Sequence, residues 1–267
     1  MKNVYIALAV LVVLLPCIAF GQANINARWV QGNLIYQAND NEMEWLGGIG
    51  QNVVVFKEDF NTLNADSTIP ASTSQMADWY WFRNDSSQQY YPTIADTTGI
   101  LKLDYGCADN DSCAILAASE FVYVDTLGTT PLSMKMRFYV GDTTQSEFKF
   151  GLMEKNLVVG HGAVNGIYVQ KLDGVNEMSL FCSRGGTVDS VVAISNMAVN
   201  TWYEVIVYCD GSGGVYGFVN GTALTKITRY TPRTARLTPA ILAKTGEASA
   251  ARKYVYFDDF DVIFLKP

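Results

Sequence analysis

The stretch Ser133-Met134-Lys135-Met136-Arg137-Phe138-Tyr139-Val140 decides the fold class of this chain. Apolar side chains occupy every second position, and polar or amphipathic side chains occupy the positions between them. A period of two places alternate side chains on opposite faces of a β-strand, whereas an α-helix repeats about every 3.6 residues. Residues 133–140 therefore predict a strand with one face in the core and the other towards solvent.

Runs of the same kind recur along the chain, and helical periodicity is nearly absent. Between them lie tight-turn signals such as Asp173-Gly174 and Asn220-Gly221. Gly and Asn readily adopt the positive φ that hairpin turns need, so many short strands joined by such turns predict an antiparallel sandwich or barrel. The other expected strands are residues 53–56, 100–103, 121–124, 147–152, 166–171, 178–182, 188–194, 202–209, 215–219 and 254–264.

Residues 1–23 are expected to be a secretory signal peptide. Lys2 precedes an apolar run over residues 4–20, and small residues follow where a signal peptidase cleaves. The alternatives are an uncleaved anchor, because the run is just long enough to span a bilayer, and a lipoprotein at Cys17, which the preceding Pro16 disfavours. Cleavage predicts a secreted protein, extracellular or periplasmic, with no membrane segment left.

Residues 24–52 are expected to form a separate N-terminal hairpin or arm. Two strand-like segments, residues 27–30 and 34–37, flank Gln31-Gly32-Asn33, and a glycine-rich joint follows at residues 47–50. A two-stranded hairpin is marginal alone, so it is expected to dock either on the main domain or on another subunit, which would give a homo-oligomer. Residues 53–267 are expected to form one domain.

Charge excludes one class of partner. The chain has 19 basic and 26 acidic residues, a net charge of −7, and no basic cluster longer than Arg252-Lys253. Proteins that bind nucleic acid need a basic surface for the phosphate backbone, so nucleic acid is not expected as a partner.

Four cysteines follow the leader, an even number in a chain expected to enter an oxidising compartment. The favoured pairing is Cys107 with Cys113 and Cys182 with Cys209, out of three possible pairings. A zinc site is not expected, because no C-x-x-C spacing occurs and the only histidine is His161.

From Glu58 onward, the order of motifs resembles the concanavalin A-like lectin/glucanase (laminin-G-like) jelly roll, especially versions in phage structural proteins and secreted bacterial proteins. The motifs are Asp59-Phe60, Trp79 and Trp81, residues 99–103, 166–169 and 201–203, the hairpin Phe218-Val219-Asn220-Gly221, residues 237–241 and Phe257-Asp258-Asp259-Phe260. The resemblance implies a lectin-like jelly roll that binds carbohydrate or a cell-surface glycan. The alternatives are a virion or cell-surface scaffold, on the virion surface if phage-encoded, and a divergent glycoside hydrolase.

The residues argue against hydrolysis. Retaining glycosidases need two carboxylates about 5 Å apart, which this fold supplies from a strand of the type Glu-x-Asp-x-Glu. The nearest run, Asp258-Asp259-Phe260-Asp261, has no glutamate, and the pair Glu42 and Glu44 lies outside the expected sandwich. A non-enzymatic protein is therefore expected.

The resemblance also implies a structural calcium ion between the first and last strands. Calcium prefers six to eight oxygen ligands, which carboxylates and carbonyls supply. The alternative is that these acids are merely solvated. The candidate ligands are Glu58, Asp59, Asp258 and Asp259, and a second acidic cluster comprises Asp104, Asp109, Asn110 and Asp111.

An aromatic stretch over residues 79–91 is the predicted ligand site. Glycan sites combine aromatic surfaces with polar side chains that read hydroxyl groups. Alternation places Trp79 and Trp81 on one face, so Tyr80 falls on the other. The alternative is that these aromatics only pack. The candidate ligand-binding residues are Tyr80, Arg83, Asn84, Tyr90 and Tyr91.

Overall fold

The computed structural model describes the protein as an all-β structure, and the predicted leader lies outside the described residues. The described residues are 28–30, 33–39, 42–45, 53–58, 60, 73–76, 79–83, 92–94, 99–106, 109, 111–117, 122–123, 131–154, 164–210, 213–232, 235–247 and 253–265. None of them belongs to a helix long and apolar enough to cross a membrane.

The strands run in chain order from β1 to β20. They are β1 (Arg28–Val30), β2 (Asn33–Asn39), β3 (Glu42–Trp45), β4 (Val53–Glu58), β5 (Thr73–Met76), β6 (Trp79–Arg83), β7 (Pro92–Ile94), β8 (Leu101–Gly106), β9 (Ser112–Ala117), β10 (Val122–Tyr123), β11 (Leu132–Val140), β12 (Ser146–Met153), β13 (Gly166–Lys171), β14 (Met178–Arg184), β15 (Thr187–Ile194), β16 (Thr201–Cys209), β17 (Val215–Val219), β18 (Thr222–Ala223), β19 (Arg236–Thr245) and β20 (Lys253–Leu265).

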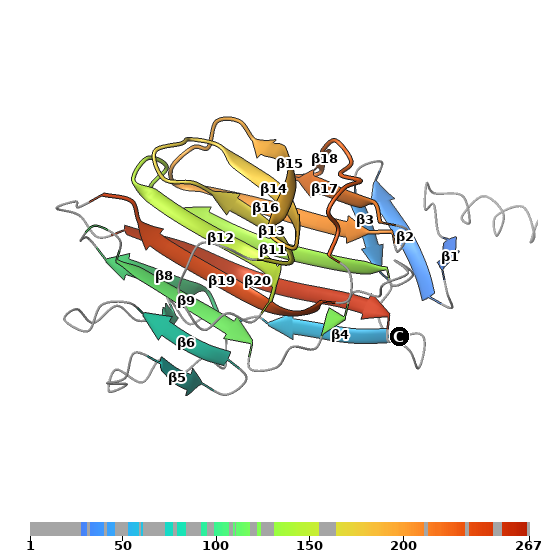
Figure 1. Ribbon diagram of the computed structural model, residues 1–267, viewed down its shortest axis with the longest axis horizontal. Helices are drawn as coiled ribbons and strands as arrows, with labels where there is room; N and C mark the ends of the chain where they lie inside the picture. The colour runs from blue at the N-terminus through green and yellow to red at the C-terminus, as the bar shows by residue number, and fades with distance from the viewer. Residues whose placement is uncertain are drawn as a thin grey trace, which may run out of the picture.

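Two large antiparallel sheets form the layers of a β-sandwich (Figure 1). The nine-stranded sheet has the order β15-β14-β13-β12-β19-β9-β6-β5, with β10 also paired to β19. The eight-stranded sheet has the order β18-β17-β16-β11-β20-β8-β7, with β4 also paired to β20. Strands β1, β2 and β3 form a separate small sheet, and its role as an assembly arm stays a prediction.

Strands β11 and β20 form the centre of the eight-stranded sheet. On β11 the alternation read from the sequence is confirmed: the apolar positions are at most 1% exposed, whereas Lys135 and Tyr139 are half-buried and Arg137 is exposed. Strand β20 pairs with β11 along one side, and β8 and β4 share its other side.

Phe138 lies at the centre of the core between the layers. Its ring centroid is 4.9 Å from that of Phe150 and 5.8 Å from that of Phe148, both in the opposite sheet. In its own sheet it stacks on Tyr203 at 5.6 Å and lies 6.4 Å from Phe257. This aromatic cluster joins the two layers.

The predicted hairpin turn at Asn220-Gly221 joins β17 to β18. Both residues have positive φ, 47° and 77°. The sequence pattern missed β9 and β19, and it treated the stretch containing β6 as loop-rich. All six residues of β9 are buried, so this strand shows no alternation.

No disulfide is found among the described residues, so the predicted pairing of Cys182 with Cys209 is not formed. Cys182 and Cys209 are buried free thiols, and so is Cys113 in β9, while Cys107 lies outside the described residues. Cys182 and Cys209 belong to opposite sheets. Burial raises the pKa of the Cys182 thiol to about 12.

Lys171, at the end of β13, is a fully buried lysine. Its Nζ donates to the carbonyl oxygens of Ser146 at 2.6 Å and Leu172 at 2.9 Å. Burial lowers the pKa of Lys171 to about 8, and nearby carboxylates oppose the shift.

We expect the free energy of unfolding of the wild type, relative to a Lys171→Met variant, to rise by about 2–3 kcal/mol between about pH 7 and pH 10. Between the native pKa of about 8 and the unfolded value of about 10.4, the unfolded chain keeps a proton that the native state has lost. Stability therefore rises with pH in this window. Urea denaturation of both proteins at each pH measures the difference, in which other titrating groups cancel. A pH-independent difference would contradict a lowered pKa.

Candidate functional site

The outer face of the nine-stranded sheet carries a second apolar cluster, separate from the core. Its buried members come from β9, β12, β13 and β19, and the half-buried Phe181 and Leu242 pack against them. Each member follows or precedes a core residue along its strand, so alternation turns it away from the core. We call this surface the Tyr168 face; its buried members are Ala114, Leu116, Met153, Tyr168 and Ala240.

Strand register orders this face into rows. In one row Tyr168 pairs with Gly151, Gly151 with Ala240, and Ala240 with Leu116. Two small residues thus separate the aromatic side of the face, on β13 and β14, from β9. The adjacent row runs through Gln170, Lys149, Leu242 and Ala114.

The Tyr168 ring lies stacked on Phe181, with centroids 5.4 Å apart and an interplanar angle of 13°. Gly151 lies against Tyr168 on the other side. A Cβ at Gly151 would lie 2.6 Å from the Tyr168 Cα and 2.5 Å from the Ile167 carbonyl oxygen. The φ of Gly151 is +147°, a conformation that L side chains rarely adopt. Glycine at this position therefore fixes where the tyrosine lies.

Polar groups border the aromatic pair. The Nζ of Lys149 lies 4.8 Å from the centroid of the Tyr168 ring, at cation–π distance. Lys149 is only 4% exposed, and burial lowers its pKa, which nearby Glu147 opposes. The Gln170 amide donates to the Glu147 carboxylate at 3.0 Å. The face thus combines a ring stack with a cation, an amide and a carboxylate.

This donor set suits a ligand with hydroxyl groups and an apolar ring face. Aromatic rings pack against the ring face, and the lysine, amide and carboxylate offer hydrogen bonds to hydroxyls. Glu147 is the one carboxylate among the described strand residues of this face. The paired carboxylates that glycoside hydrolysis uses are not present among those residues.

A second aromatic surface lies on the outer face of the eight-stranded sheet; we call it the Tyr139 face. Tyr139 lies 5.5 Å from Trp202 and 5.4 Å from Tyr256, and Tyr254 lies 5.1 Å from Tyr256, between ring centroids. These four rings are half-buried. Trp202, Tyr139 and Tyr256 form one row across β16, β11 and β20, and Tyr254 lies two residues before Tyr256 on β20.

The polar groups of the Tyr139 face form ion pairs, hydrogen bonds and ring contacts with one another. Arg137 lies over the Trp202 ring at 4.6 Å and pairs with Asp258. The Tyr139 hydroxyl donates to the Asn200 side-chain oxygen at 2.8 Å. Cross-strand pairs of this kind stabilise a sheet without a ligand.

The structure describes two of the five predicted ligand-binding residues, and only their backbone. Tyr80 pairs with Leu116, a residue of the Tyr168 face, whereas Arg83 pairs with Cys113, a core residue. The two therefore hold register positions on opposite faces of β6. The other three, Asn84, Tyr90 and Tyr91, lie outside the described residues.

Two of the four predicted calcium ligands, Glu58 and Asp258, have partners within the protein. Glu58 accepts hydrogen bonds from the Phe60 amide at 2.7 Å and from the Trp79 indole at 2.8 Å. Asp258 forms an ion pair with Arg137. Burial, and to a lesser degree the negative charge of Asp258, raises the pKa of Asp259. Asp59 lies outside the described residues.

The second acidic cluster gives no support for a metal either. Asp104 is buried and lies 3.8 Å from the Lys102 ammonium, Asp111 is buried, and Asp109 is exposed, while Asn110 lies outside the described residues. No group of three or more potential ligands among His, Cys, Asp and Glu occurs in the described part of the chain.

No protein-family model matches the sequence, and a search of curated proteins finds no match. Solved structures do match the fold. A seed lectin of Lotus tetragonolobus is 11% identical, with 80% of this chain and 100% of the lectin chain covered and a TM-score of 0.52. A β-glucanase of Bacillus licheniformis is 11% identical, with 80% of this chain and 98% of the glucanase chain covered and a TM-score of 0.50.

The chain has the concanavalin A-like jelly-roll fold. A protein of unknown function from Shewanella oneidensis MR-1 is also similar to this jelly roll, at 11% identity, 82% of this chain and 89% of that chain covered, and a TM-score of 0.55. The fold-class prediction is thereby confirmed. Because the same jelly roll occurs in a lectin and in a glucanase, the function depends on the residues of the site.

The sequence pattern missed the residues of the Tyr168 face. Tyr168 and Lys149 were read only as parts of expected strands, and Phe181 likewise. A signal was present in the sequence: Lys149, Tyr168 and Phe181 are large or charged side chains at positions that strand alternation turns outward. A sandwich strand buried on both faces indicates that its outer face is also covered or used.

Proposed function

We propose that this jelly roll is an exported, non-enzymatic carbohydrate-binding module that holds its ligand on the Tyr168 face. The observation that carries the proposal is the buried Lys149 beside the Tyr168–Phe181 stack. Burying a cation at the surface of a sheet costs free energy, as its lowered pKa shows, and such a cost is typical of functional sites. The lectins among the structural neighbours support the same assignment.

The Tyr168 face is favoured over the Tyr139 face because a buried cation lies beside a ring stack whose rim is partly exposed. On the Tyr139 face, the cation Arg137 has both an ion pair and a ring partner. On the Tyr168 face, the half-buried Phe181 and Glu147 border buried residues, so a ligand can reach the rim of the cluster.

Binding is favoured over hydrolysis because the described strand residues of this face offer one carboxylate, Glu147, where a retaining or inverting mechanism needs two. Lys149 and Gln170 offer hydrogen bonds to sugar hydroxyls and supply no second acid. The role that the described residues support is recognition.

Replacing Phe181 with alanine is expected to weaken glycan binding by about tenfold or more, because covering a phenylalanine side chain with a ligand contributes roughly 1.5–3 kcal/mol. A glycan array identifies the ligand, and titration calorimetry with the strongest hit measures the affinity. Trp202→Ala, on the Tyr139 face, is the matched control and is expected to leave the affinity unchanged.

Two outcomes would overturn this assignment. Loss of affinity in Trp202→Ala but not in Phe181→Ala would move the site to the Tyr139 face. An array without a hit at millimolar sugar would favour the scaffold hypothesis over carbohydrate binding.

A further inference from the structure

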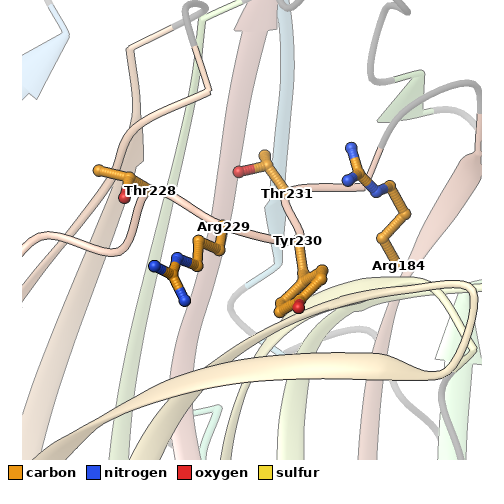
Figure 2. Close-up of a pocket in the computed structure, with 5 residues that line it drawn as sticks. All are labelled: Arg184, Thr228, Arg229, Tyr230 and Thr231. Carbon is orange, nitrogen blue, oxygen red and sulfur yellow. The ribbon is translucent and has the colours of Figure 1, made fainter.

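A pocket of about 290 Å³ lies where the end of β14 meets the segment after β18. Two arginines, two threonines and a tyrosine line it. Figure 2 shows Tyr230 between Arg229 and Arg184 in that view. The lining residues are Arg184, Thr228, Arg229, Tyr230 and Thr231.

The segment that carries most of this lining is anchored on both sides. Ile227 forms a two-way backbone bridge with Val215, at 2.8 and 2.9 Å, and its side chain is buried. The Thr231 hydroxyl donates to the Gly213 carbonyl oxygen at 2.8 Å. Residues 228–230 are therefore held in place over the pocket, which lowers the entropy cost of binding.

The two arginines have no acidic partner in the described part of the chain, although the protein has a net charge of −7. The neighbouring Lys226, by contrast, pairs with Asp210 at 3.2 Å. Both Arg184 and Arg229 are exposed at the pocket, so they place two positive charges there.

Tyr230 has a φ of +53°, in the left-handed region that few residues other than glycine adopt. A non-glycine residue there stores conformational energy, and such residues cluster at ligand sites. The surrounding anchors at Ile227 and Thr231 hold this conformation. The strained tyrosine is an observation independent of the two charges.

We propose that this pocket binds an oxyanion, the carboxylate or sulfate group of an acidic saccharide. Guanidinium groups form paired, charge-assisted hydrogen bonds with planar or tetrahedral oxyanions. The Tyr230 and Thr228 hydroxyls supply further donors. The ligand class of the protein is then an anionic rather than a neutral polysaccharide.

This inference deepens the proposed function but does not need the same residues. Arg184 follows Phe181 by three residues on β14, a separation of about 10 Å along a strand. Residues three apart alternate to opposite faces of a strand, so the pocket is a subsite separate from the Tyr168 face. Binding of a free anion, however, tests the pocket alone.

The test compares oligogalacturonate with its methyl ester, which has the same sugar chain without the charge, at constant ionic strength. The wild type is expected to bind the acid at least about tenfold more tightly than the ester. The double variant Arg184→Gln/Arg229→Gln is expected to lose this preference. Arg236→Gln, an exposed arginine outside the pocket, is the matched control and is expected to keep it.

Sodium sulfate supplies the second arm, measured by thermal shift against sodium chloride of equal ionic strength. Stabilisation by sulfate that disappears in the double variant supports an oxyanion pocket even if no neutral glycan binds, so failure of the proposed function is distinguishable. A preference for oligogalacturonate without a sulfate effect assigns the pocket to carboxylates. An unchanged preference in the double variant, or no response to either anion, overturns the proposal.

Discussion

Replacing Phe138 with alanine is expected to lower the free energy of unfolding by about 3–5 kcal/mol, the cost of removing a buried aromatic ring. The ring is fully buried and contacts Phe148 and Phe150 in one sheet and Tyr203 and Phe257 in the other. Hydrogen-bonded ladders hold these neighbours in place, so the layers cannot close over the cavity. The loss therefore lies in the upper part of the range for such substitutions.

Urea denaturation followed by fluorescence measures this loss, and thermal melting should show a decrease in Tm of roughly 10 °C. Val192→Ala is the control: it also shortens a β-strand side chain, but Val192 is 46% exposed. The control is expected to change stability by less than about 0.5 kcal/mol. Equal losses in the two variants would mean that Phe138 is not central to the core.

Replacing Gly151 with alanine is expected to cost about 2–5 kcal/mol, the sum of backbone strain at positive φ and overpacking. The added Cβ would meet backbone atoms of Ile167 and Tyr168 at 2.5 and 2.6 Å. Backbone atoms in a ladder cannot rotate away as a side chain does. Tyr168 must shift, so glycan binding is expected to fall as well.

Gly174→Ala separates the two causes. Gly174 also has positive φ, +69°, but no heavy atom lies within 4 Å of its added Cβ. This control therefore measures strain alone, expected to be about 1–2 kcal/mol. A loss at Gly151 no greater than at Gly174 would show that the close approach to Tyr168 carries no cost.

The sequence predicted most strands of the eight-stranded sheet because their outer faces are polar. Strand β11 alternates clearly, since Arg137 and Lys135 reach solvent while Met136 and Phe138 enter the core. Strand β9 was missed because its sequence, Ser112-Cys113-Ala114-Ile115-Leu116-Ala117, is small or apolar throughout and shows no period of two. Burial on both faces does not by itself hide a strand, since β13 is also fully buried and was predicted at residues 166–171.

Strand β19 was missed for a different reason. It contains Pro239, and proline lacks the amide that a central strand donates to its neighbour. In the structure β10 pairs with Leu237 and Arg236, and β9 pairs from Ala240 onward. Pro239 lies in the gap between these two partners, where no donor is needed on that side. Only the arrangement of the whole sheet shows this gap.

Local sequence patterns predicted an antiparallel β-sandwich with an Asn-Gly hairpin turn, because strand alternation and positive-φ turns are local properties. The contacts of Tyr168 with Phe181 and Lys149 on one face could be seen only in the tertiary structure. The same holds for the free thiols of Cys113, Cys182 and Cys209. Such contacts depend on strand order and register, which bring together residues that are far apart in the chain.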